Sequence, residues 1–542
     1  MVLKRAVQVM EPNPDNSKLA AYTRVLIVSS LTSYVRFAVA FISLLLLTPF
    51  VLEKIGYSDY GLWTFAFACV GYLEMLECGI TNAAIKYFGH SAARGDAEQR
   101  NLLASTLRWV YIVLALVVGT LAMAVSFFIP GLFDIGQAQQ GKAQILLLIL
   151  SMRILLNLPL GVYYSMLFGR QKIYVVNIIR TFSLIGYSLS VWWALSVDLG
   201  LLTQAALNTA FLFAEHVAFA IACKRLFPAM RISWRLFDRG LLRKVIAFGG
   251  FAMATNIGSV VIIRTDPLVV SLFMPLAMVG FYGLALRIAE QVMLVTKQFI
   301  NLFTPVFAEL HGAGDKAVIK VVFINYSKLA FGAAAAVSLP LMIFSTDALI
   351  LWVGEDFRVV GSVLAILLLT SLIRVMQAAA TNSLAMTGFQ RFVAGAVGIS
   401  AIVNLVFTVA MGAWMGLLGI AIGGLLVALG TAVVLLLKTC GEFEISTSTY
   451  TKKIFVPMLL PLSFQAIACG IFYVSMRPTS LTMLALELLG SLAIFAPAAW
   501  WIAFTQAERD FIGRQVAGLR WRRQRDGQAQ VSLHLDAKPQ PS

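Results

Sequence analysis

Nine charged side chains lie well inside stretches of the sequence that are otherwise apolar. They are Arg36, Arg153, Arg264, Arg287, Arg374, Glu74, Glu77, Asp266 and Glu290. If these stretches cross a bilayer, each charge costs roughly 2.5–3.5 kcal/mol on insertion scales, so functional roles are expected by default. Guanidinium forks match the oxygens of phosphate, and the arginines therefore favour an anionic ligand.

The acids allow several interpretations. Glu74 and Glu77 are three residues apart and share one helix face. They could pair with Arg36 across the first two apolar stretches, hold other arginines in place, or bind a coupling Na⁺ or H⁺.

Two of the arginine–acid combinations are close in sequence. Arg264 and Asp266 are two residues apart, and Arg287 and Glu290 are three apart, so each could be neutralised locally. Two arginines have no acid close in sequence, namely Arg36 and Arg374.

The elements that hold these residues are predicted to be membrane-spanning helices. Of 542 residues, 60% are hydrophobic and 13% are charged, with a mean hydropathy of +0.85, whereas soluble domains carry about 25% charged residues. Apolar stretches of the roughly 20 residues that a crossing needs occur near 25–52, 59–88, 105–130, 143–168, 174–197, 200–223, 245–273, 278–307, 318–345, 359–386, 392–412, 416–438, 453–475 and 481–505. We predict an all-α membrane protein with about fourteen transmembrane helices.

The basic residues predict the orientation, because Arg and Lys concentrate on the cytoplasmic side. With the N-terminus inside, 32 of the 42 fall in cytoplasmic segments and four on the opposite face. The cytoplasmic set includes Arg170, Lys172 and Arg180 after the fourth span. We therefore predict a multi-pass protein of the inner (cytoplasmic) membrane with both ends inside.

The predicted organisation has six parts. They are a cytoplasmic segment 1–24, an N-lobe of six spans 25–223, a cytoplasmic interfacial linker 224–244, a C-lobe of six spans 245–440, two further spans in 441–505, and a basic tail 506–542. Residues 226–244 mix aromatic, aliphatic and Arg positions as an interfacial helix does. These Arg clusters predict binding to anionic membrane lipids and not to nucleic acid.

The lobes are predicted from an internal duplication. The matching positions are Gly95-Asp96 with Gly314-Asp315 and Gly169 with Gly388, both 219 residues apart, and Pro49 with Pro267, 218 apart. Six spans per repeat give both halves the same orientation, a scheme that transporters use for alternating access. Because most of the buried charges lie in the first two spans of each repeat, we expect them to face one shared cavity.

Catalytic and metal-binding motifs are absent from the sequence. There is no GxxxxGK[ST] pattern, and the five cysteines and four histidines have no metal-ligand spacing. Membrane glycosyltransferases and polymerases usually carry large external loops, but every predicted external connection here is short. We predict a transporter without catalytic residues, metal or other cofactor, apart from the coupling Na⁺ or H⁺.

Four motifs near the start of the chain carry a family resemblance. They are Thr48-Pro49-Phe50, then Ile55-Gly56-Tyr57-Ser58-Asp59-Tyr60-Gly61-Leu62-Trp63, then Tyr72-Leu73-Glu74-Met75-Leu76-Glu77-Cys78-Gly79, and Gly95-Asp96. With the 6+6+2 plan of spans, they resemble the polysaccharide-transport branch of the multidrug/oligosaccharidyl-lipid/polysaccharide exporter superfamily, which shares the MATE-like fold. In that branch an Asp is commoner where Glu77 stands.

The resemblance implies a flippase for O-antigen, exopolysaccharide or a similar glycan. Such proteins move the headgroup of an undecaprenyl-diphosphate-linked oligosaccharide across the membrane while the lipid tail stays in hydrocarbon. On that analogy the buried arginines attract the diphosphate and sugar acids, and the acids shape the cavity or couple transport. The implied partners are the lipid-linked oligosaccharide, membrane lipids and polysaccharide polymerase or assembly proteins.

Two alternatives come from the same superfamily. A cation-coupled multidrug exporter takes mostly cationic substrates, and the arginines argue against that function. A lipid II flippase also has fourteen spans and a cationic cavity, although its motifs match this sequence less well.

Overall fold

The computed structural model describes residues 17–93, 96–133, 137–301, 307, 316–506 and 508–509. Within these residues the regular structure is helical and no strand occurs. Twelve helices are long and apolar enough to cross a membrane, so the predicted all-α class is confirmed. Most of the predicted segment 1–24 and of the tail 506–542 lies outside the described residues.

Two of the twelve helices are pairs of spans joined by a sharp turn at a glycine. Helix α14 (Gln390–Glu442) turns at Gly416, whose φ of 64° favours a residue without a side chain. Positions on either side of the turn meet: Gly412 lies against Ile420, Gly423 against Phe407, and Ser400 bonds Thr431 at 2.6 Å. The helix therefore crosses, turns and crosses back.

Helix α2 (Ser17–Ala93) turns in the same way at Gly56, where φ is 80°. Near its start, the Ser29 carbonyl accepts a hydrogen bond from Asn177, and near its end Gly89 lies against Gly169. Because residues 169 and 177 flank one short turn, both ends of α2 lie at the same end of the molecule. Counting α2 and α14 twice gives fourteen crossing segments. We call the opposite end of the molecule, where α2 turns, the Gly56 end.

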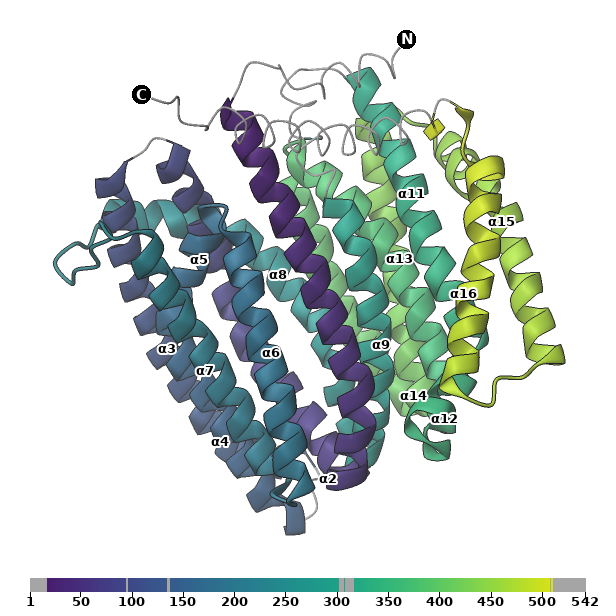
Figure 1. Cartoon of the computed structure of the whole chain (residues 1–542), viewed down its shortest axis with the longest axis horizontal. Helices are drawn as coiled ribbons and strands as arrows, with labels where there is room; N and C mark the ends of the chain where they lie inside the picture. Colours follow the sequence, from purple (N-terminus) through teal and green to yellow (C-terminus); the bar gives the residue numbers. More distant parts are fainter. Residues whose placement is uncertain are drawn as a thin grey trace, which may run out of the picture.

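The remaining helices of the first bundle follow α2 in order. They are α3 (Ala97–Leu132), α4 (Gln137–Asn157), the 3-10 turn η1 (Leu158–Leu160), α5 (Gly161–Gly169), α6 (Ile173–Ser196) and α7 (Gly200–Leu226). The fourth span is broken into α4 and α5 at Pro159, which has no N–H to donate to the preceding turn. Figure 1 shows α3–α7 gathered on one side of the first crossing of α2, drawn in purple.

The second bundle and the last two spans complete the chain. Their helices are α8 (Arg239–Phe273), α9 (Leu276–Asn301), α11 (Lys316–Ile343), α12 (Ser345–Val353), η2 (Glu355–Val360), α13 (Gly361–Met386), α14, α15 (Thr447–Ser475), α16 (Leu481–Ala498) and the short π-helix η3 (Ala499–Ala503). Helix α15 packs on α11 through Gln465, which bonds the Ala336 carbonyl at 2.8 Å. Figure 1 shows α15 and α16 at the edge far from α3–α7.

The exterior of both bundles is apolar. Large side chains such as Phe182, Trp414 and Val474 are 71%, 77% and 85% exposed. Contiguous apolar surface of this kind is rare on soluble monomers. It fits helices whose outer faces contact acyl chains.

The prediction of an interfacial helix over residues 226–244 is wrong for most of this range. Residues 227–238 form a loop, and α8 begins only at Arg239, capped by Asp238. The loop lies across α3, where its carbonyl at Ala229 accepts from Arg100 and the Trp234 ring packs edge-on against Trp109. Bonds to α3 thus replace the internal hydrogen bonds of the expected helix.

The two bundles touch backbone to backbone at the Gly56 end. A Cβ atom on Gly61 of α2 would overlap the carbonyl of Leu276, and one on Gly280 would lie 3.0 Å from the Gly61 nitrogen. Beside this contact the Tyr57 and Phe281 rings meet edge to face at 5.2 Å. At this end the bundles are closed against each other.

Substituting Gly61 with Val is expected to hold the bundles apart at this end, because the new side chain has no room. A disulfide between cysteines introduced at Tyr57 and Phe281 should then form at least tenfold less in membranes. Gly141→Val is the matched control, since a Cβ there meets nothing within 4 Å. Equal cross-linking in both variants would contradict the closed contact.

Candidate functional site

The most completely bonded buried charge is Arg153 of α4, which reaches across to α2. Its Nε donates to Glu74 Oε1 at 2.9 Å, a second guanidinium N–H donates to the same oxygen, and Nη1 donates to Asn208 Oδ1 at 3.2 Å. The guanidinium also lies over the Phe67 ring, 5.1 Å from its centroid. Glu74 therefore pairs with Arg153. The pairing of Glu74 with Arg36, which was one interpretation of the sequence, does not form.

Tyr187 of α6 extends this group toward the second bundle. Its hydroxyl lies near the side chains of Gln204 and Asn208, and it interacts electrostatically with both Arg153 and Arg287. Because Arg287 belongs to α9, charges from both bundles approach one tyrosine.

A second contact between the bundles is formed by neighbouring residues of α2 and α8. The Arg264 side chain lies against Gly71, where an added Cβ would come within 3.2 Å of Nε. The next pair along, Tyr72 and Thr265, share a short hydrogen bond between their hydroxyls. Arg153, Arg264 and Arg287 thus gather where α2 meets the second bundle, and we call these three with Glu74 the boundary cluster.

The two local ion pairs considered for the second bundle do not form. Arg264 and Asp266, and Arg287 and Glu290, make no salt bridge within 4.0 Å, although all four are among the described residues. Asp266 instead accepts a hydrogen bond from the Tyr282 hydroxyl at 2.8 Å, while its other oxygen is buried without a partner.

Glu77 points into the first bundle, one helical turn from Glu74. It accepts a hydrogen bond from Thr81 at 3.2 Å, and Thr81 in turn bonds the Tyr111 hydroxyl at 2.8 Å. Gly161, at the break between η1 and α5, leaves room for this carboxylate, because a Cβ there would lie 3.2 Å from Oε1. The interrupted fourth span therefore makes space for an acid.

Arg36 approaches a pair of charges that the sequence analysis missed. Arg180 of α6 pairs with Glu215 of α7 at 3.2 Å, and the Arg36 charge interacts with both. Arg36 itself stacks on Phe37 at 4.9 Å, and its Nε has no partner. Arg180 was assigned to the cytoplasmic side, but it lies two turns inside α6. Its position within the predicted span 174–197 could have signalled this.

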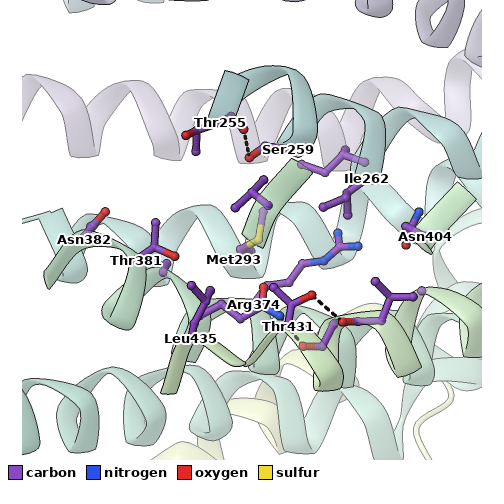
Figure 2. A pocket seen from close by; sticks show the side chains of 17 residues that line it. Thr255, Ser259, Ile262, Met293, Arg374, Thr381, Asn382, Asn404, Thr431 and Leu435 are labelled. Carbon is purple, nitrogen blue, oxygen red and sulfur yellow. Dashed lines mark hydrogen bonds between the residues drawn. The ribbon is translucent and has the colours of Figure 1, made fainter. Parts of the chain in front are cut away.

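Arg374 lies apart from the other arginines, in a cavity of the second bundle. The cavity has a volume of about 290 Å³ and is bounded by α8, α9, α13 and both arms of α14. Figure 2 shows the Arg374 side chain extending across it among amide and hydroxyl groups. Seven of the nine predicted residues thus fall in three regions, the boundary cluster, the first-bundle interior and this second-bundle cavity, and Asp266 and Glu290 line none of the three. Among the described residues, no three or more His, Cys, Asp or Glu side chains are grouped to hold a metal ion.

This arrangement of two helix bundles matches the folds of solved transporter structures. The lipid II flippase MurJ, in an inward closed conformation, aligns with 87% of this chain and 98% of its own, with a TM-score of 0.65 at 15% identity. An inward-facing multidrug resistance transporter of the MATE family and MOP superfamily aligns with 74% of this chain and 98% of its own, with a TM-score of 0.61 at 14% identity. The predicted MATE-like fold is confirmed.

Sequence relatives agree with this class. The chain is 21% identical over 328 residues to the uncharacterized membrane protein EpsK of Bacillus subtilis, covering 59% of this chain and 64% of EpsK, slightly under two thirds of its length. It is 22% identical over 310 residues to a putative O-antigen transporter of Shigella flexneri, covering 57% of this chain and 72% of that protein. No family model matches the sequence. The predicted resemblance is confirmed by these relatives. The putative O-antigen transporter and the solved transporter structures agree with the prediction of a transporter and not an enzyme.

Proposed function

We propose that this protein flips an undecaprenyl-diphosphate-linked oligosaccharide across the inner membrane for the synthesis of a cell-surface polysaccharide. The observation that carries the proposal is the boundary cluster. Three guanidinium groups gather where the bundles meet, and only Arg153 has a carboxylate within 4.0 Å among the described residues. A site with this excess of positive charge favours a diphosphate.

Alternating access would carry the headgroup past this cluster. The bundles are closed at the Gly56 end, which is the outer end if both termini are cytoplasmic. The headgroup would enter from the cytoplasm, meet Arg264 and Arg287, and leave once the Gly61 contact opens. Its lipid tail would remain in hydrocarbon, beside the apolar outer faces of the helices. A polymerase or other assembly protein would take up the glycan outside.

A lipid II flippase is the second candidate, because MurJ shares the fold over nearly its whole length. Lipid II also carries a diphosphate, so the arginines do not separate the two. A cation-coupled multidrug exporter is disfavoured, since a cationic drug would be repelled by the boundary cluster.

The experiment that separates these functions uses the purified chain in proteoliposomes. Fluorescent undecaprenyl-diphosphate oligosaccharide, lipid II and a cationic dye would be offered in turn, and translocation measured by loss of access to an outside quencher. Faster movement of the oligosaccharide lipid than of the other two supports the proposal. Translocation of lipid II alone would support a lipid II flippase, and translocation of the dye alone would support a multidrug exporter.

Glu77→Gln is expected to change the Na⁺ or pH dependence of this transport, because Glu77 is an acid buried beside neutral hydroxyls and Arg180. If it binds the coupling ion, the rate should lose its dependence on that ion while substrate binding persists. Glu98→Gln, on the exposed first turn of α3, is the matched control. An unchanged ion dependence in Glu77→Gln would make its role structural.

A further inference from the structure

The second-bundle cavity holds a buried amide that has no hydrogen-bond partner among the described residues. Asn404 is fully buried and lines the cavity, yet neither its amide nitrogen nor its oxygen has a partner. An unpaired buried polar group costs about 1–3 kcal/mol, so such a residue indicates a missing ligand or solvent. Arg374 faces the same space and makes no salt bridge within 4.0 Å among the described residues.

In the first bundle, the arginine on the fourth span is bonded to a carboxylate and an amide. Arg153 and Arg374 both lie on the fourth span of their repeats, but they are 221 residues apart and so two positions out of the 219-residue register. The residues 219 positions after Glu74 and Asn208, which bond Arg153, are Met293 and Val427. Both line the cavity around Arg374. The second bundle therefore has an arginine on the same span, with apolar residues at the positions that match Glu74 and Asn208.

The charge nearby limits what can replace that carboxylate. Asp266 interacts electrostatically with Arg374 but does not line the cavity, and Glu290 interacts with Asp266. A cation would face the guanidinium directly. A divalent anion would add two negative charges beside Asp266. A single negative charge balances the guanidinium with the least repulsion.

We propose that this cavity binds a small monovalent anion, held by the Arg374 guanidinium and the Asn404 amide. The hydroxyl of Thr381, which also lines it, can donate a further hydrogen bond. The anion balances the Arg374 charge as Glu74 balances that of Arg153 in the first bundle, and it joins α13 to α14. This site is separate from the boundary cluster and does not depend on which lipid is carried.

The test measures the thermal unfolding of the full chain in detergent. At constant ionic strength and sodium concentration, gluconate is replaced stepwise by chloride. Chloride is expected to raise the Tm in a saturable way, and Arg374→Gln should abolish the rise. No saturable rise in the unmodified protein would overturn the proposal.

Met293→Glu restores the missing carboxylate and is the decisive variant. It should be stable without chloride and insensitive to added chloride, while the matched variant Met293→Gln should keep the chloride dependence. If Met293→Glu responds to chloride like the unmodified protein, the proposal is wrong. Sulfate stabilising more than chloride would contradict a monovalent site. Stabilisation by glucuronate but not by chloride would contradict a free anion and point to a sugar carboxylate.

Discussion

Arg264→Ala is expected to lower glycan export at least tenfold while the protein remains in the membrane at its normal level. Arg264 faces Gly71 at the boundary of the bundles and has no salt bridge within 4.0 Å among the described residues. A hydrogen bond to a charged group is worth about 1.5–3 kcal/mol, which corresponds to roughly 10- to 150-fold in affinity. Because Arg264 makes no salt bridge to another described residue, its loss should affect substrate binding more than folding.

The measurement is the amount of surface polysaccharide made in cells that lack the native copy, beside the amount of the variant in membranes. Arg264→Lys should recover part of the export, since it keeps the charge but not the planar fork. Arg358→Ala is the matched control, because Arg358 pairs with Glu355 on an exposed 3-10 turn of the same bundle. Normal export by Arg264→Ala would remove this residue from the substrate path.

Removing either member of the Arg153–Glu74 pair is expected to destabilise the first bundle. Breaking a buried pair costs about 3–5 kcal/mol, and we expect a smaller loss here because the Glu74 side chain is 37% exposed. Glu74→Gln and Arg153→Gln should each lower the Tm by several degrees and reduce export. The double variant should be no less stable than the worse single one, since neither charge is then left alone.

A double-mutant cycle on these two positions separates pairing from independent effects. The coupling free energy should exceed about 1 kcal/mol, because two N–H groups of Arg153 donate to one Glu74 oxygen. Glu98→Gln with Arg153→Gln provides the control cycle, in which the effects should add. A coupling near zero would show that the two charges stabilise the bundle separately.

The fold was predictable from the sequence because a bilayer leaves few choices. A backbone in hydrocarbon must bond itself, so each apolar stretch of sufficient length has to be a helix. The turn between the two spans of α2 occurs at Gly56, and the break in the fourth span occurs at Pro159. Both are residue types that interrupt a helix. The loop 227–238 was not predictable, because its amphipathic pattern is typical of a helix. Its backbone forms hydrogen bonds with side chains of α3 instead, and these contacts cannot be read from the sequence.

The candidate residues were recognisable, but their partners were not. Arg36, Arg153 and Arg374 stand out because charge in an apolar run is costly. Which charge meets which depends on how each helix is turned about its axis, and packing between distant segments determines that. Residues two apart, such as Arg264 and Asp266, lie on different faces of a helix, so this pairing could have been dismissed beforehand.

Helix α2 bonds to both bundles at once. Its first arm is tied to α6 through Asn177 and, nearer the turn, to α12, where the Trp352 ring N–H donates to the Leu45 carbonyl at 2.8 Å. Parting the bundles at the Gly56 end must break the second tie or bend the arm. The Leu45 carbonyl is free to accept because Pro49, four residues later, has no N–H to donate to it. This contact can therefore be changed at Trp352 or at Pro49. A substitution at one such position is therefore expected to change how long the two bundles stay closed at the Gly56 end.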